Sequence, residues 1–337
     1  MPNEERLEEI RRDASEQGVV TGRGVDVTGG PIPQKLATAS PSDGGPGYYG
    51  EPVVRPPVWT WEIPIYFFVG GAGGMSAVIA AAAAASDHIE IAGDAMLLGA
   101  IAAIISPILL IMDLGRPRRF LNMLRVFKPQ SAMSMGAWIL TLFSPCVVAG
   151  FVTLELHSHH AFAGTADHLL RLIADVMIAG AAILGALLAT YTGVLIGATT
   201  IPAWFLHRVL LPIHFGTAGL GSAAALLELL GHRVPALNAL GYYAAAIETV
   251  LLIWLTLNRH GAADRAVHQH QAGWLIRIAE IFTGPLAIVL RLLGQVPFAA
   301  AVFLIGALAS RYGWLAVGRI SGCDTEAVFA SQVKSNR

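Results

Sequence analysis

The stretch IAGDAMLLGAIAAIISPILLIMDLGRPRRFLNMLRVFKPQSAMSM, residues 91–135, decides the fold class of this chain. Its first half, up to Met112, is apolar apart from Asp94 and is long enough to cross a bilayer, which takes about 20 residues. Asp113 and four arginines follow directly. Because charge of this density cannot follow the apolar run into hydrocarbon, the boundary at Asp113 indicates a membrane surface.

The composition of the whole chain indicates the same class. Hydrophobic residues make up 55% of the sequence and charged residues 13%, with a mean hydropathy of +0.60, whereas soluble domains carry about 25% charged residues. We therefore expect an all-α integral membrane protein. Its cysteines, Cys146 and Cys323, are too few to ligate an iron–sulfur cluster and indicate no disulfide framework.

Three regions are expected along the chain. Residues 1–57 form an extramembrane arm, residues 58–320 a transmembrane helical bundle and residues 321–337 a C-terminal tail. The arm begins with a charged stretch and continues with many Gly, Pro, Ser and Thr residues, so it is expected to be largely disordered. No apolar segment follows its early arginines, and a cleavable signal peptide is therefore not expected.

Apolar segments of membrane-spanning length recur through the bundle, and we expect about eight of them. The seventh is the shortest and contains Glu280, Pro285 and Arg291, so seven spans plus one surface helix is the alternative. The expected segments are 63–85, 91–112, 134–154, 169–198, 209–230, 236–257, 278–293 and 296–317.

Two local motifs invite a functional interpretation but favour a simpler one. The GGAGG run at residues 70–74 lies inside an apolar helix with no preceding strand, so it favours close helix packing over a dinucleotide site. The HSHH run at residues 157–160 lies in a polar loop without a matching set of ligands nearby, so no metal site is expected.

Span parity sorts the polar residues between the two membrane faces. The start of the first span (Trp61, Glu62), the end of the second (Asp113, Arg116) and the end of the fourth (Tyr191) fall at one face, together with His207 and Arg208. Lysines and arginines concentrate in the loops at that face, so the positive-inside rule predicts that the N-terminal side is cytoplasmic. The expected location is the plasma (inner) membrane.

Carboxylates inside spans are costly and are functional candidates by default. Glu248 falls near the middle of a span, while Asp94, Glu155 and Asp175 fall toward the opposite face. These residues could form a proton relay, or they could pair with helix ends and interfacial groups. Haem is not expected, because axial histidines must come from facing helices whereas His207 and His214 share one helix.

Three runs carry a family resemblance: WTWEIPIYFFVGGAGG (59–74), MDLGRPRRFLNMLRVFKPQSAMSMGAW (112–138) and ATYTGVLIGATTIPAW (189–204), with LLP shortly after. They resemble the NrfD-type polysulfide reductase membrane-subunit family over about residues 48–330. The resemblance implies a subunit without haem or metal that binds a quinone, menaquinone or ubiquinone, near one face. It also implies two partners, a ferredoxin-like iron–sulfur subunit docked there and a molybdopterin catalytic subunit, and no nucleic acid.

Alignment on the GGAGG run places the family's quinone contacts on Glu62 and on Tyr191 of the YTG motif. A histidine that some members carry one turn further along falls here on Ile65, beside Tyr66. Tyr191 is expected to hydrogen-bond the quinone, with catalytic roles in proton handling for Glu62, Asp113 and Glu248. The expected quinone-binding set is Trp61, Glu62, Tyr66, Asp113, Arg116, Tyr191 and His214.

The remaining basic residues of the loop, Arg118, Arg119, Arg125 and Lys128, are expected to contact lipid head groups or the docked partner. Arg116 would hold Asp113 and stabilise negative charge on the reduced quinone. The alternatives are a secondary transporter or proton-conducting protein, favoured by broken helices and Glu248, and a purely structural anchor. No internal repeat supports the transporter, and an anchor would give Glu62, Asp113 and Tyr191 no reason to converge.

Overall fold

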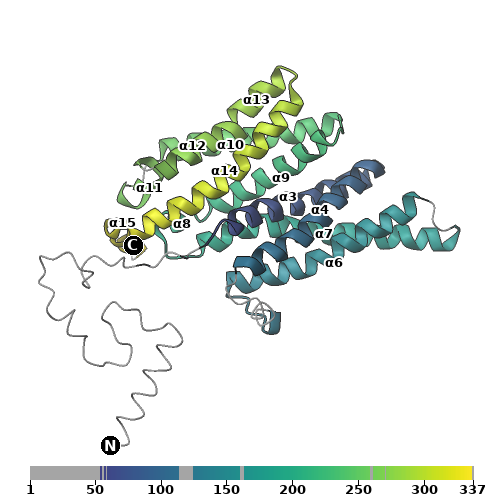
Figure 1. The fold of residues 1–337 in the computed structure, drawn as a ribbon, viewed down its shortest axis with the longest axis horizontal. Coiled ribbons are helices and arrows are strands. Elements are labelled where there is room, and N and C mark those ends of the chain that lie inside the picture. Colours follow the sequence, from purple (N-terminus) through teal and green to yellow (C-terminus); the bar gives the residue numbers. More distant parts are fainter. Residues whose placement is uncertain are drawn as a thin grey trace, which may run out of the picture. The chain divides into compact units, whose positions relative to one another are not determined.

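The computed structural model describes residues 54, 57, 59–113, 124–159, 163–258, 261–269 and 271–335, all in the unit that spans Val54–Arg337. Nearly all of the expected N-terminal arm lies outside the described residues, and so do Arg116, Arg118 and Arg119. Every regular element in the described ranges is a helix. Figure 1 shows these helices with the labels used below.

Within the described residues, seven helices are long and apolar enough to cross a membrane, at seven of the eight segments that the run lengths predict. Pro107 lies inside the second of them without ending it. The seven helices are α3 (Glu62–Ala85), α4 (Ile89–Asp113), α6 (Ala132–Ser158), α7 (Thr165–Gly197), α9 (Leu210–Leu229), α10 (Pro235–Leu257) and α14 (Val296–Cys323). The chain is therefore a multi-pass membrane protein.

The expected seventh segment is a broken helix. It consists of α12 (Gln271–Thr283) and α13 (Pro285–Leu292), separated at Gly284 because Pro285 cannot continue the hydrogen-bond ladder of α12. Gly273 in α12 packs closely against Val267 near the end where α10 finishes, whereas Arg291 in α13 bonds Glu228 at the end of α9. In the part of the chain that the structure describes, the pair thus runs from one end of the bundle to the other, as expected for the seventh of eight segments, although neither helix alone is long enough to span a membrane.

Four short helices lie together at one end of the bundle, the end where α10 finishes. They are α8 (Pro202–Leu206), η2 (Gly261–Asp264), α11 (Arg265–Gln269) and α15 (Thr325–Ser335). In α11, Arg265 bonds Glu326 of α15 at 2.7 Å, and the backbone N–H of Ala203 in α8 donates to Ser321 of α14 at 3.4 Å. The segment expected as a C-terminal tail therefore holds the end of α14 and one further helix.

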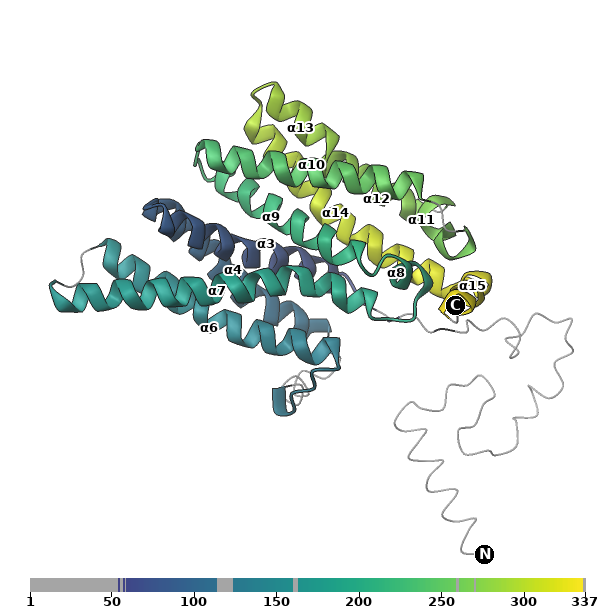
Figure 2. The same cartoon turned by 180° about the vertical axis from the view of Figure 1, so that it is seen from behind.

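Helices α3 and α9 lie side by side at the centre of the bundle, as Figures 1 and 2 show from opposite sides. Helix α3 also packs against α4 and α7, and α9 against α10 and α14. The contact of α3 with α7 is backbone to backbone: a Cβ on Gly74 would overlap the carbonyl oxygen of Gly185. The GGAGG run thus serves close helix packing, as its context predicts.

Two ends of the bundle are distinguished by their contacts. At the proximal end, where α3 begins, Thr60 bonds Asp113 at the end of α4, and the Tyr312 hydroxyl of α14 donates to the Trp61 carbonyl at 3.2 Å. At the distal end, where α3 finishes, His232 after α9 pairs with Asp94 of α4 at 2.7 Å. The proximal end therefore holds Trp61, Glu62, Asp113 and Tyr191, which the order of the spans predicts to lie at one membrane face.

Candidate functional site

A cavity of about 320 Å³ lies at the proximal end, enclosed by the first four long helices. This volume is near the lower end of the about 300–1,000 Å³ typical of ligand pockets. Ile63, Tyr66 and Phe67 of α3 face it, and the remaining walls are Trp59, Leu110, Asp113, Met133, Ala137, Tyr191 and Leu195. Aromatic and aliphatic walls with a few polar groups suit a flat, largely apolar ligand.

Tyr191 reaches the cavity because α6 has no side chain in its way. A Cβ on Gly136 would overlap the Tyr191 ring, and one on Gly193, two residues after Tyr191, would overlap the backbone of Leu211. The first glycine makes room for the phenol, and the second lets α7 approach the start of α9. The YTG sequence therefore fixes both the position of the ring and the packing of its helix.

The hydroxyl groups of Tyr66 and Tyr191 are the neutral polar groups of this cavity. Both side chains are buried, and neither hydroxyl has a hydrogen-bond partner within the described ranges. A phenol hydroxyl can both donate and accept a hydrogen bond, and a buried one normally has a partner. The two phenols can thus bind the carbonyl or hydroxyl oxygens of a ligand.

One hydroxyl group links Asp113, which lines the cavity, to a second carboxyl group, that of Glu62. Thr60 Oγ1 lies 3.1 Å from Asp113 Oδ1 and also contacts Glu62 Oε2, while the Thr60 backbone N–H donates to Asp113. A threonine hydroxyl carries one hydrogen, so it donates to one carboxylate and accepts from the other only when that group is protonated. The Glu62–Thr60–Asp113 bridge is therefore suited to holding and passing a proton.

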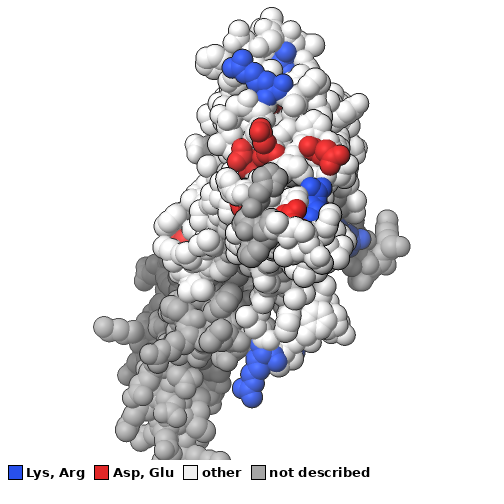
Figure 3. Space-filling model, turned by 90° about the vertical axis from the view of Figure 1, so that its right-hand side faces the viewer, with Lys and Arg blue, Asp and Glu red and all other residues white. Residues whose placement is uncertain are grey.

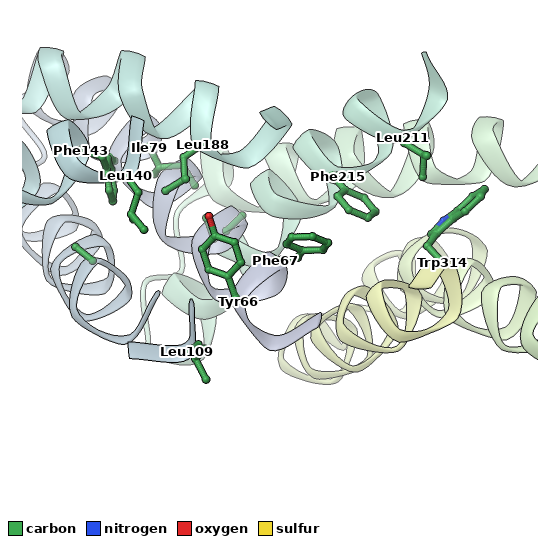
Figure 4. Close-up of a cluster of buried hydrophobic side chains, with 14 of the residues drawn as sticks. Tyr66, Phe67, Ile79, Leu109, Leu140, Phe143, Leu188, Leu211, Phe215 and Trp314 are labelled. Atoms are coloured by element: carbon green, nitrogen blue, oxygen red, sulfur yellow. The ribbon is translucent and has the colours of Figure 1, made fainter. Parts of the chain in front are cut away.

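Aromatic side chains join this cavity to the second half of the bundle. Trp59 stacks on Trp204 of α8 at 5.5 Å between ring centroids, and Phe67 lies 6.0 Å from Phe215 of α9. Figure 4 shows Phe67 between Tyr66 and Phe215, with Trp314 further along. The wall of the cavity is thus part of the continuous hydrophobic core.

The family comparison agrees with this arrangement. The sequence model described as "Polysulphide reductase, NrfD" matches residues 52–239, which include α3 to α9 and every described residue that lines the cavity. The chain belongs to the NrfD family. No curated protein matches the chain. NrfD proteins are membrane subunits of multi-subunit reductases, so the resemblance seen in the three sequence runs is confirmed at the level of the family.

A second polar centre is buried between α9, α10, α12 and α14, mostly beyond the residues that the NrfD model matches. His214 Nδ1 lies 2.6 Å from Glu248 Oε2, and its Nε2 contacts the Ser310 hydroxyl. Thr217 donates to the other oxygen of Glu248. Glu280 and Arg311 are buried in the same part of the bundle.

The expected quinone-binding residues do not all converge. Tyr66, Asp113 and Tyr191 line the cavity, and Glu62 joins it through Thr60, whereas Trp61 is 54% exposed. His214 and Glu248 belong to the second centre, and Arg116 is outside the described residues. Arg125 and Lys128 are exposed between α4 and α6, as expected for contact with lipid or a partner.

Other titratable residues singled out in the sequence are paired locally. At the distal end His157 bonds Asp167, His159 pairs with Glu155, Arg171 pairs with Asp175, and Asp94 pairs with His232. Apart from Glu248, the residues considered for a proton relay thus have neighbouring partners near the surface. Within the described ranges no group of His, Cys, Asp and Glu could hold a metal ion.

Three residues around the cavity are not predicted by the sequence pattern. Trp59 lines the cavity, whereas the sequence favours Trp61, and Thr60 bridges the two carboxyl groups. Gly136 is the third of these residues, because its lack of a side chain leaves space for the Tyr191 ring. A small residue within an Ala- and Ser-rich helix start, SAMSMGA, was the available signal, but it did not indicate which ring would fill the space.

Proposed function

We propose that the cavity at the proximal end binds the head of a membrane quinone, and that this NrfD subunit exchanges electrons between the quinone and an iron–sulfur subunit docked at the same end. The observation that carries this proposal is a largely apolar cavity lined by two tyrosines and by Asp113, which Thr60 links to Glu62. Menaquinone and ubiquinone both fit this chemistry, since each has a flat ring with two carbonyl groups.

The polar residues have distinct roles in this proposal. The Tyr191 hydroxyl, with Tyr66 beside it, orients the quinone oxygens by hydrogen bonds. Reduction of a quinone consumes protons and oxidation of a quinol releases them, so the Glu62–Thr60–Asp113 bridge serves either direction. Arg116 would hold Asp113, compensate its charge and stabilise negative charge on the reduced quinone.

The partner of this subunit supplies or accepts the electrons. The proposed partners are a ferredoxin-like iron–sulfur subunit and, behind it, a molybdopterin catalytic subunit. The proximal end offers exposed Arg125 and Lys128 after α4, and a cap built by α8, η2, α11 and α15. A docked acidic partner would meet the basic segment there.

The test replaces Tyr191 with Phe in the complete complex. Removal of one hydrogen bond costs about 1 kcal/mol, so the apparent affinity for a short-chain quinol should fall roughly fivefold. Tyr243→Phe is the matched control, because Tyr243 of α10 is 68% exposed on the surface of the bundle. Equal quinol affinity in both variants, with normal assembly, would remove Tyr191 from the site.

The second polar centre favours an additional candidate function, proton conduction. Glu280 Oε2 and two guanidinium nitrogens of Arg311 are buried without hydrogen-bond partners within the described ranges. Buried polar atoms normally have a protein or water partner, and intramembrane ionisable groups typically mark ion or proton pathways. In this candidate function, Glu280, Arg311 and the His214–Glu248 pair pass protons between the proximal and distal ends of the bundle.

A proton-uptake assay tests this candidate. The complex is reconstituted in liposomes containing a pH-sensitive dye, and quinol oxidation is started from outside. Glu248→Gln should abolish transmembrane proton movement while electron transfer continues, whereas Asp175→Asn should change neither, because Asp175 is paired with Arg171 at the distal surface. Unaltered proton movement in Glu248→Gln would exclude this role.

A further inference from the structure

A larger cavity of about 460 Å³ lies at the distal end, away from the proposed quinone site. It is formed where α9 ends, α10 begins and the turn between α13 and α14 passes. Polar groups of Glu228, His232, Arg233 and Asn238 line it beside apolar residues that include Val296 and Pro297. Neither the NrfD family match nor the proposed electron transfer assigns a role to this cavity.

The acidic residue of the cavity is neutralised from within the protein. Arg291, itself buried, binds both oxygens of Glu228 at 2.7 and 2.8 Å, and it donates to Asn238 Oδ1 at 2.8 Å. Bidentate pairs of this kind are strong and directional. A Cβ on Gly241 would overlap the guanidinium group, so the arginine is held in a fitted position. Glu228 therefore presents no net negative charge to the cavity.

The remaining charge balance of the cavity is positive. His232 is compensated by Asp94 at 2.7 Å, but Arg233 is exposed and has no ion-pair partner among the residues that the structure describes. The long helices α10 and α14 both begin at this cavity, and helix N-termini favour anions. Figure 3, which views the distal end, shows Lys and Arg side chains near the top, with acidic and further basic ones near the middle.

The surroundings of the cavity are those of a membrane interface. The turns that form it precede α10 and α14, two helices long and apolar enough to span a membrane, so we expect the cavity at the depth of the lipid head groups. Large apolar side chains beside these turns are exposed: Leu230 by 57%, Leu293 by 67% and Phe298 by 65%. An anionic group carried on an acyl chain would satisfy both the cationic cavity and the apolar rim, whereas a water-soluble anion would leave the rim uncovered.

We propose that this distal cavity binds the phosphate head group of an anionic phospholipid, with Arg233 as its main cationic contact. The bound lipid would join the α9–α10 turn to the α13–α14 turn. This inference is independent of quinone binding at the proximal end, and the two can fail separately.

The test places the full complex in nanodiscs of phosphatidylcholine with or without phosphatidylglycerol. Retained phosphatidylglycerol is counted by native mass spectrometry, and its apparent affinity is measured by thermal stabilisation. Arg233→Gln should weaken the affinity about tenfold, as loss of one charge-assisted hydrogen bond implies. Arg171→Gln is the matched control, since this distal arginine is paired with Asp175 and lies on α7, away from the cavity.

The outcomes separate the sources of the anion. Retention in the wild type and in Arg171→Gln, with loss in Arg233→Gln, supports the proposal. Equal retention in all three chains overturns it, and so does a failure of the wild type to prefer phosphatidylglycerol. Equal stabilisation by inorganic phosphate in phosphatidylcholine discs overturns the lipid assignment and indicates a soluble anion. Arg233→Lys, which keeps the charge, should retain most of the binding if the fold of the turn is intact.

Discussion

The ring of Tyr191 occupies the space that a side chain at Gly136 would otherwise fill. Helix α6 thus approaches α7 closely enough to enclose the cavity, while the phenol still reaches it. Because the ring lies against Gly136 with no side chain between them, a Cβ added at residue 136 would displace it. The size of residue 136 therefore controls the position of the proposed quinone ligand.

Gly136→Ala is the first prediction from this relationship. The added methyl group overlaps the Tyr191 ring, and relief of such overpacking costs about 1–3 kcal/mol. The ring should shift, and quinol-linked turnover should fall at least as far as in Tyr191→Phe. Turnover in isolated membranes and the melting temperature of the purified complex check the two effects separately.

Gly180→Ala is the control for that substitution. Its Cβ would lie 3.7 Å from Cys146 Sγ, an ordinary contact across the same α6–α7 interface. Turnover and melting temperature should stay near the wild-type values. If the two alanine variants lose turnover equally, the defect comes from the packing of α6 on α7 in general, and the specific role of Gly136 is refuted.

The His214–Glu248 pair predicts strong coupling between two buried residues. His214→Ala leaves a carboxylate buried without its nitrogen partner, and breaking a buried pair costs about 3–5 kcal/mol. The double variant His214→Ala/Glu248→Ala should lose much less than the sum of the two single variants. Thermal unfolding of the four chains in detergent measures this cycle, and additive losses would show that the pair is not coupled.

Cys323 provides a test of membrane orientation. Helix α14 has 28 residues, about 42 Å at 1.5 Å per residue, and exceeds the about 30 Å hydrocarbon core. We therefore expect its proximal end, where Cys323 is exposed, to project from the bilayer. A membrane-impermeant maleimide should label inside-out vesicles but not right-side-out ones, if the N-terminal side is cytoplasmic.

Cys323→Ser should abolish that labelling. The other cysteine, Cys146, lies near the middle of α6 and is only partly exposed, so the reagent should not reach it. Labelling of right-side-out vesicles alone would reverse the orientation and place the proposed partner outside the cytoplasm. The proximal cavity itself would be unaffected by that result.

The sequence predicts the helical passes well because length and apolar composition suffice for them. Parity then places Glu62, Asp113 and Tyr191 at one end, and the structure brings them close through Thr60 and the cavity wall. The seventh segment was ambiguous because Pro285 divides it, and only contacts at both of its ends show that it runs the length of the bundle.

The rotation of each helix about its axis could not be predicted in the same way. Lipid-facing and protein-facing sides of these helices are both apolar, so no amphipathic stripe indicates which side is buried. The sequence therefore places His214 among the quinone-binding residues, whereas in the structure it contacts Glu248 and Ser310. The pairing of Arg291 with Glu228 was missed for the same reason, since it joins residues far apart in the sequence.

The most direct test of the quinone site is photo-cross-linking of the intact complex in membranes with an azido-substituted short-chain quinone. The label, mapped by peptide mass spectrometry, should lie on the cavity segments of α3, α6 and α7, near Tyr66, Ala137 and Tyr191. Excess unmodified quinone should compete it away, and Leu195→Trp, which fills the cavity, should reduce it. A competable label confined to α10 or α14, with these segments unlabelled, would contradict quinone binding at this site.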